Sequence, residues 1–210
     1  MNAHRKMIRR TALVAAAGVA ALVLAACGGE GGHDMGSMGG SSSSPSAAAS
    51  SEAGDHNAAD VSFAKEMIQH HRQAVEMAEL ADTRAASEGT KELAAKIKGA
   101  QGPEIKTMSG WLTSWGEEVP ADMSGMGHDM ASSMPGMMTS EDMDKLEGAK
   151  GAEFDTQFAE MMIKHHEGAI EMAETEKADG TYGPAKKLAD EVVKAQTAEI
   201  EQMNTMLGKS

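Results

Sequence analysis

The stretch Phe63-Ala-Lys-Glu-Met-Ile-Gln-His-His-Arg-Gln-Ala-Val-Glu-Met-Ala-Glu79 decides the fold, because the chain repeats it 95 positions later as Phe158-Ala-Glu-Met-Met-Ile-Lys-His-His-Glu-Gly-Ala-Ile-Glu-Met-Ala-Glu174. The same offset aligns residues 91–112 with residues 186–207 without a gap, so an internal duplication is the simplest explanation. Both copies place a tandem histidine between methionines in a helical pattern. Imidazole and thioether groups are ligands that soft metal ions prefer.

The composition favours an all-α protein. Aromatic residues make up only 3% of the chain, and Ala, Glu, Lys, Met and Leu dominate both repeats, which is a helical composition. Each repeat predicts a helical hairpin, with helices at about 60–83 and 87–115 and again at 152–178 and 184–207, and a short helix at 139–148. Two hairpins of similar length predict a ferritin-like four-helix bundle with a long methionine-rich crossover. Pro103 is expected to kink its helix or to remove a backbone hydrogen bond.

Residues 1–26 have the pattern of a lipoprotein signal peptide. Basic residues precede an apolar run over 11–26, which is too short to count as a membrane span of the mature protein. The sequence Leu24-Ala-Ala-Cys27 resembles a bacterial lipobox, so Cys27 is expected to carry lipid and to anchor the protein to the cell membrane, outside the cytoplasm. The alternative is an ordinary signal peptide that is cleaved nearby and leaves Cys27 free. The chain has no second cysteine, which excludes an intramolecular disulfide.

Removal of the leader takes away four basic residues and no acidic one, which leaves 15 basic and 32 acidic residues and a net charge of −17. Such a surface repels nucleic acid and anionic lipid and attracts cations. We therefore expect no nucleic-acid partner, and contact with the membrane only through the lipid. Residues 27–57 are rich in Gly and Ser and predict a flexible tether. The bundle should occupy 58–210, with repeat 1 at 60–117, a linker at 118–140 and repeat 2 at 152–207.

Both histidines of each repeat fall on the apolar face of a helical wheel. Met67 and His71 lie one turn apart, so their side chains can converge on one ion. The second repeat places Met162 and His166 in the same way. Gln73 falls on the opposite, polar face of the first helix.

A carboxylate lies in the middle of the apolar stripe of each partner helix, at Glu104 and Glu199. Burying an unpaired carboxylate costs several kcal/mol, so each one needs a cationic, hydrogen-bonding or metal partner. One solution is a Glu and a Met of one helix facing a Met and a His of the other, once per hairpin. The alternative is a buried hydrogen bond between His71 and Glu104, with methionines filling a small-residue core.

The linker contains many methionines in a segment rich in glycine and serine, where core residues are not expected. Thioether sulfur is soft and prefers Cu(I) or Ag(I) to Zn(II), Mg(II) or Ca(II). Gly-His-Asp-Met also occurs twice, at 32–35 and at 127–130. The alternatives are a disordered spacer or a sink for oxidants made of sacrificial methionines. The candidate ligands of the linker are Met123, Met126, His128, Met130, Met134, Met137 and Met138.

The pattern Phe-x-x-x-Met-Ile-x-His-His-x-x-Ala-x-x-Met-Ala, followed by Ala-Gln-x-x-Glu-Ile-x-x-Met, resembles the DUF305 family of secreted bacterial proteins over residues 60–207. Members resemble ferritin-like four-helix bundles. Some of them, including a cyanobacterial copper-resistance protein, are implicated in binding copper outside the cytoplasm. The ligands that this resemblance implies are Met67, His70, His71, Met108, Met162, His165, His166 and Met203, with Glu104 and Glu199 as further candidates.

We therefore expect an extracytoplasmic, lipid-anchored copper-binding protein that is not an enzyme and that sequesters copper or hands it over. Cu(I) is favoured in the methionine-rich parts, and either Cu(I) or Cu(II) near His and Glu. One alternative is a ferritin-like enzyme of metal or oxygen redox chemistry, which would use paired Glu and Glu-x-x-His ligands. Another is a structural or interaction lipoprotein whose histidines are core residues. A delivery partner and a homo-oligomer both stay open.

Overall fold

The computed structural model describes residues 54–122 and 134–209, and these ranges form five helices and no strand. The predicted signal peptide, Cys27 and most of the tether lie outside the described residues. Within the described ranges, no helix combines the length and the apolar character needed to cross a membrane. The helices are α1 (Ala58–Arg84), α2 (Glu88–Trp115), α3 (Ser140–Gly148), α4 (Ala152–Asp179) and α5 (Gly183–Met206).

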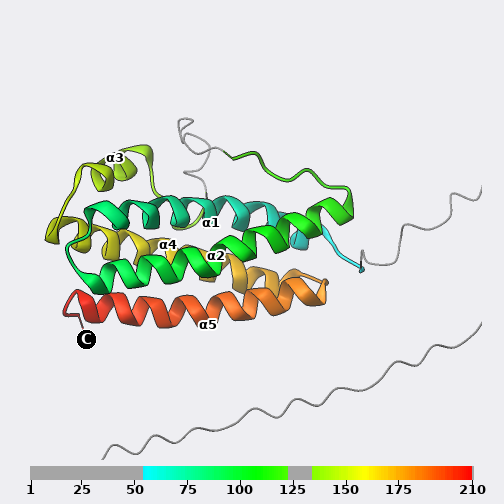
Figure 1. Ribbon diagram of the computed structural model, residues 1–210. Coiled ribbons are helices and arrows are strands. Elements are labelled where there is room, and N and C mark those ends of the chain that lie inside the picture. The colour runs from blue at the N-terminus through cyan, green and yellow to red at the C-terminus, as the bar shows by residue number, and fades with distance from the viewer. Residues whose placement is uncertain (1–53, 123–133, 210) are drawn as a thin grey trace, which may run out of the picture. The chain divides into compact units, whose positions relative to one another are not determined.

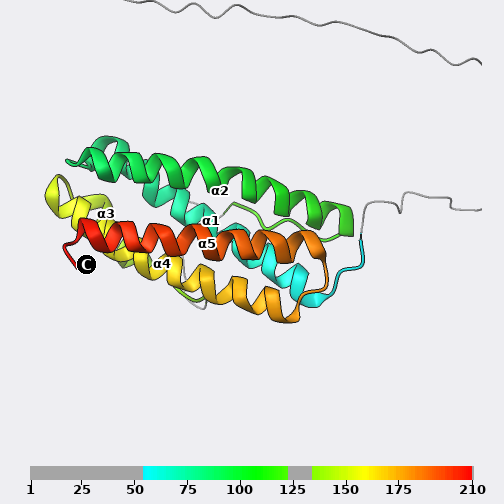
Figure 2. The same cartoon turned by 90° about the horizontal axis from the view of Figure 1, so that it is seen from below.

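The four long helices form a bundle of two antiparallel hairpins, α1–α2 and α4–α5 (Figures 1 and 2). The hairpins meet mainly through α1 and α4, and α3 packs on these two helices, at the end of the bundle where α1 finishes and α4 begins (Figure 1). The predicted all-α bundle of two duplicated hairpins is confirmed. Helix α2 continues through Pro103 as one element.

Capping residues define where the helices begin. Asn57 caps α1 by accepting hydrogen bonds from the backbone of Ala59 and Asp60, and the Asp60 carboxylate accepts one from Asn57 N in return at 2.7 Å. Thr139 and Asp142 form the same reciprocal arrangement at the start of α3. Such boxes satisfy backbone N–H groups that the first helical turn leaves unpaired.

The first-turn aspartate of each repeat also binds the interhelical turn of the other hairpin. Asp60 accepts from Tyr182 N at 2.9 Å, and Asp155 accepts from Ser87 N at 2.9 Å. Tyr182 and Ser87 occupy equivalent positions of the two repeats, 95 residues apart. The two hairpins are therefore related by an approximate twofold axis and hold each other reciprocally.

Buried apolar side chains form two clusters, one towards each end of the bundle. On every long helix the middle turn belongs to neither cluster, because it carries buried or half-buried polar side chains instead. We call this central polar layer the waist. Its members are His70, His71, Gln101, Glu104, His165, His166, Gln196 and Glu199.

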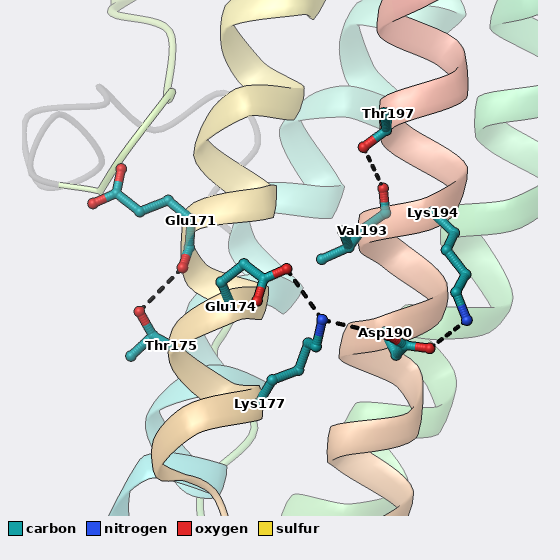
Figure 3. Close-up of polar contacts among 8 residues, drawn as sticks. All are labelled: Glu171, Glu174, Thr175, Lys177, Asp190, Val193, Lys194 and Thr197. Carbon is teal, nitrogen blue, oxygen red and sulfur yellow. Dashed lines mark hydrogen bonds and ion pairs between the residues drawn. The ribbon is translucent and has the colours of Figure 1, made fainter.

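Ion pairs join α4 and α5 on their outer surface. Lys177 contacts Glu174 at 3.1 Å and Asp190 at 3.4 Å, and Asp190 also pairs with Lys194 (Figure 3). Exposed pairs of this kind contribute about 0–1 kcal/mol each. The bundle therefore depends mainly on its two apolar clusters and on the reciprocal aspartate contacts.

Candidate metal centre

Four histidines form the centre of the waist, and none of them exposes any surface to solvent. His70 of α1 and His165 of α4 contact each other across the two hairpins, with ring centroids 3.7 Å apart and ring planes tilted by 39°. Because these residues occupy equivalent positions of the duplication, their contact lies on the approximate twofold axis. The tandem histidines of the two hairpins are therefore in contact with each other through His70 and His165.

The other two histidines are each hydrogen-bonded to the glutamate of their own hairpin. His71 Nε2 lies 2.7 Å from Glu104 Oε2, and His166 Nε2 lies 2.8 Å from Glu199 Oε2. A carboxylate only accepts, so each Nε2 donates its proton to the carboxylate, and a ring with no second proton keeps the Nδ1 lone pair free. The histidine–glutamate contacts expected from the sequence are present. The hydrogen bond between His71 and Glu104 is the contact that the alternative of a buried polar pair predicted.

The two histidine–glutamate pairs have different surroundings. The side chain of Glu199 is 5% exposed and also contacts Lys96 Nζ at 3.3 Å, whereas the side chain of Glu104 is 22% exposed. Burial raises the pKa of Glu199, but the hydrogen bond from His166 and the charge of Lys96 outweigh burial and lower the pKa below its ordinary value,. The position equivalent to Lys96 in the second repeat is Glu191. The second hairpin therefore buries its carboxylate more deeply, and Lys96 gives that carboxylate a cationic partner from the other hairpin.

His70 and His165 are neutral at physiological pH. Burial, with the neighbouring His71 as the next cause, lowers the pKa of His70 to about 3. Burial also lowers the pKa of His165 well below its ordinary value, with His70 as the next cause. His70 Nε2 donates to the Pro135 carbonyl at 3.1 Å. Neutral imidazole with one nitrogen free is the form that binds metal ions.

Several buried polar atoms of the waist have no hydrogen-bond partner among the described residues. These atoms are Nδ1 of all four histidines, Nε2 of His165, and Oε1 of Gln101 and Gln196. A buried acceptor without a partner costs about 1–3 kcal/mol, and native proteins keep few of them. So many in one layer indicate a site for a cation or for ordered water rather than a region selected for stability.

The predicted methionine ligands are fully buried on either side of the waist. Met67 and Met108 belong to the cluster at one end, and Met162 and Met203 to the cluster at the other. Each hairpin thus brings its two predicted methionines into one cluster. Over the described ranges, no three His, Asp or Glu side chains converge as a ready metal-binding group. An ion held here would need thioether ligands, or a small movement of the rings.

Part of the linker packs into the core, and here the sequence-based expectation was wrong. Met137 is 7% exposed and Met138 is 1% exposed, although neither was expected to contribute to a core. The reason is Gln73, which donates to Met138 O at 3.0 Å and accepts from Met138 N at 2.7 Å. Gln73, expected on the polar face, is therefore buried as well. We call residues 134–138 the strap; Met134 is half-buried, and Met123, Met126, His128 and Met130 lie outside the described residues.

Two glycines allow the strap to approach α4 closely. A Cβ on Gly168 would lie 2.1 Å from Pro135 O, and Gly136, at φ 75°, lies against the backbone of α4. Gly168 and Gln73 are equivalent positions of the two repeats, and both contact the strap. The sequence signal for this contact was therefore a difference between the repeats, Gln in one copy and Gly in the other.

Comparison with known proteins places this geometry in a family. The family described as a domain of unknown function, DUF305, matches residues 60–207. A solved structure described as a secreted DUF305 protein from Streptomyces coelicolor is 34% identical, with a TM-score of 0.64, over 72% of this chain and 93% of that chain. A DUF305 fragment from Deinococcus radiodurans is 26% identical, with a TM-score of 0.64, over 75% of this chain and 100% of that chain.

The protein CopM is also similar. Its Cu(I)-bound form is 34% identical, with a TM-score of 0.59, over 70% of this chain and 94% of that chain. Its Cu(II)-bound form is 38% identical, with a TM-score of 0.60 over the same shares. No match was found among curated proteins. From the match to residues 60–207 and the likeness to these structures, the chain belongs to the DUF305 family.

Proposed function

We propose that this protein binds copper ions outside the cytoplasm, with Cu(I) favoured, and that the waist is where the ion is held. The observation that carries the proposal is the set of four buried imidazoles whose Nδ1 atoms have no partner among the described residues. The protein would sequester copper or hand it over, and the linker methionines would capture the ion first. The predicted lipid on Cys27 would keep it at the membrane, and the description of the Streptomyces relative as secreted agrees with that location.

The hydrogen bonds of the waist support this proposal. Histidines that bind metals usually donate their other ring N–H to a carboxylate or a backbone carbonyl, which fixes the tautomer and the ring orientation. Here Glu104, Glu199 and the Pro135 carbonyl accept from the Nε2 atoms of three histidines. In our proposal the two glutamates orient imidazoles, and Nδ1 rather than Nε2 binds the ion.

The choice of copper rests on the softness of the available ligands. Thioether and imidazole groups together suit Cu(I), and imidazole also suits Cu(II). Met67, Met108, Met162 and Met203 surround the waist with buried thioethers. The similar protein CopM has Cu(I)-, Cu(II)- and Ag-bound structures. We propose a binding protein rather than an enzyme, so Fe(II) and oxygen should give no catalysed oxygen consumption.

A titration with a matched histidine control tests the proposal. In a variant with Met123, Met126, His128 and Met130 replaced by Ser, and with His33 and Met35 of the other Gly-His-Asp-Met copy also replaced by Ser, binding by the bundle and the strap can be measured. Cu(I) at 100 times its Kd should stabilise this variant by about 2.7 kcal/mol, which raises the Tm of a domain of this size by roughly 5–10 °C. Replacing both His71 and His166 by Ala should abolish the shift, whereas His56→Ala, outside the waist, should keep it.

Two results would oppose the proposal. An unchanged stoichiometry and an unchanged thermal shift in the His71→Ala/His166→Ala variant would remove the waist as the binding site. The absence of any shift with Cu(I), Cu(II), Zn(II) or Fe(II) would favour a structural or interaction protein whose histidines are core residues.

A further inference from the structure

The four histidines of the waist expose no surface to solvent, although Glu104 at its edge is half-buried. Any ion that reaches them must move part of the protein aside. We propose that a metal cation reaches the waist through the groove between α1 and α4. The strap closes the inner end of this groove and must open to admit the ion. This inference rests on the proposed binding of copper.

The groove ends at the strap. It has a volume of about 200 Å³ and is lined on α1 by Ser62 and Glu66, on α4 by Glu171 and Thr175, and by Pro135 of the strap. The Pro135 carbonyl accepts from His70 Nε2 at 3.1 Å. A single strap residue therefore lies between the groove and the first imidazole of the waist.

The chemistry of the groove suits a cation. Glu66 and Glu171 are exposed carboxylates on its two walls. Figure 3 shows the Glu171 side chain extending away from α5, on the other side of α4 from the Lys177–Asp190 ion pair. The backbone carbonyl of His165 lies against Gly136 of the strap, its ring contacts the ring of His70, and both of its ring nitrogens are unpartnered among the described residues. A hydrated cation would thus meet carboxylates first and imidazole next.

The duplication shows that the fold does not require a polar groove. The twofold-related position lies under α3, where three of the corresponding residues are apolar and belong to the buried cluster or pack on it. Glu171 and Ser62 correspond to Glu76 and Gln157, so the covered copy keeps one carboxylate where the open copy has Glu66, Glu171 and Glu176. The equivalents of Glu66, Thr175 and Glu176 are Met161, Leu80 and Ala81.

The strap is held in a way that permits opening. Gln73 contributes two hydrogen bonds to Met138 and His70 donates one to the Pro135 carbonyl. Met137 and Met138 are buried, and the contact with α4 is made through the glycine pair Gly136 and Gly168. Loss of two net hydrogen bonds changes an opening equilibrium by roughly 10- to 100-fold. Gln73→Ala should therefore open the strap more often and leave the four long helices in place.

The first test needs no metal. Diethyl pyrocarbonate transfers a carbethoxy group to a neutral imidazole nitrogen and releases ethanol and carbon dioxide, and mass spectrometry locates the product. In the full-length protein, Gln73→Ala should raise the rates at His70 and His165 by roughly 10- to 100-fold. The rates at His71 and His166 should change several-fold less. Gln101→Ala, which removes another buried glutamine of the waist, is the matched control and should not give this selectivity.

Two outcomes of that test overturn the proposal. One is an unchanged rate at His70 and His165 in Gln73→Ala. The other is equal acceleration at all four histidines, which would mean that the reagent enters by general opening of the bundle.

The second test measures copper uptake by stopped flow. The pair Glu66→Gln/Glu171→Gln should lower the association rate constant by about tenfold, because a cleft lined by negative charges concentrates cations. The pair Glu92→Gln/Glu201→Gln, on exposed positions of α2 and α5, makes the same charge change and should lower it less. Equal slowing by both pairs overturns the proposal that the ion enters through the groove. If the wild type binds no copper but the histidine labelling is selective, the proposed copper binding fails. The strap is then still the segment that controls access to His70 and His165.

Discussion

A buried carboxyl pair at the end of the bundle opposite α3 gives a prediction that needs no metal. Glu176 is 1% exposed, and no hydrogen-bond donor among the described residues reaches either of its oxygens. Asp60, beside it, accepts from the backbone of Asn57, Thr181 and Tyr182. Burial, with the contact with Asp60 as the next cause, raises the pKa of Glu176 from 4.5 to about 8. Glu176 therefore holds a proton at neutral pH.

The sign of the pH dependence follows from that proton. The folded state keeps it up to about pH 8, whereas the unfolded chain loses it near pH 4.5. The stabilising contribution of the protonated carboxyl is thus complete below pH 4.5 and is lost as the pH rises to 8. A rise of the pKa from 4.5 to about 8 corresponds to at most about 5 kcal/mol at 1.36 kcal/mol per unit. Asp60 acts in the opposite sense, because its pKa is lowered and its contribution is lost only on acidification below about 3.8.

Glu176→Gln is the perturbation that tests this account. An amide has the same shape, donates to Asp60 without a titrating proton, and respects the tight space beside Gly180, where a Cβ would lie 2.2 Å from Glu176 Oε1. Urea unfolding between pH 5 and 9, followed by tryptophan fluorescence and circular dichroism, should show a flatter profile than the wild type and a higher stability at pH 8. Glu174→Gln, on the exposed face of α4, is the control. Parallel profiles for Glu176→Gln and the wild type would refute the reasoning.

Other substitutions test the fold and the strap. Asp60→Ala removes an acceptor of four hydrogen bonds and should cost about 3 kcal/mol or more of unfolding free energy,. Asp155→Ala removes one cross-hairpin hydrogen bond and should cost about 1 kcal/mol,. Equal costs in urea titrations would contradict this assignment. Gly168→Ala drives a methyl group into Pro135 O at 2.1 Å and should cost about 1–3 kcal/mol,. Gly110→Ala meets no atom within 4 Å and should stabilise α2 by about 0.5–1 kcal/mol,; a Gly168→Ala variant as stable as Gly110→Ala would contradict the close approach.

Periodicity and duplication made the helices and the buried histidines predictable. The 3.6-residue period places His71 and Met67 on one face, and a carboxylate in an apolar stripe requires a partner, so the contact with Glu104 followed from local pattern alone. The offset of 95 residues then transferred the same argument to His166 and Glu199. These features depend only on neighbours within a single hairpin.

Contacts between the hairpins could not be predicted in that way. Wheel analysis put Gln73 on a polar face, because nothing in its own helix shows that a strap from residue 134 onwards covers it. Met137 and Met138 lie in a segment whose glycines argue against regular structure, yet Gly136 is what lets that segment pack against α4. The contact of His70 with His165 depends on how the two hairpins pack against each other. The duplication predicts two similar hairpins but does not say which of their faces meet.

The most direct test of the central claim is copper K-edge X-ray absorption on the Cu(I)-loaded protein in which His33, Met35, Met123, Met126, His128 and Met130 are replaced by Ser. Binding by the waist predicts a ligand shell with both imidazole nitrogen and thioether sulfur, and loss of the nitrogen contribution in the His71→Ala/His166→Ala variant. A shell of sulfur alone that the double variant leaves unchanged, or no bound copper, would contradict the account.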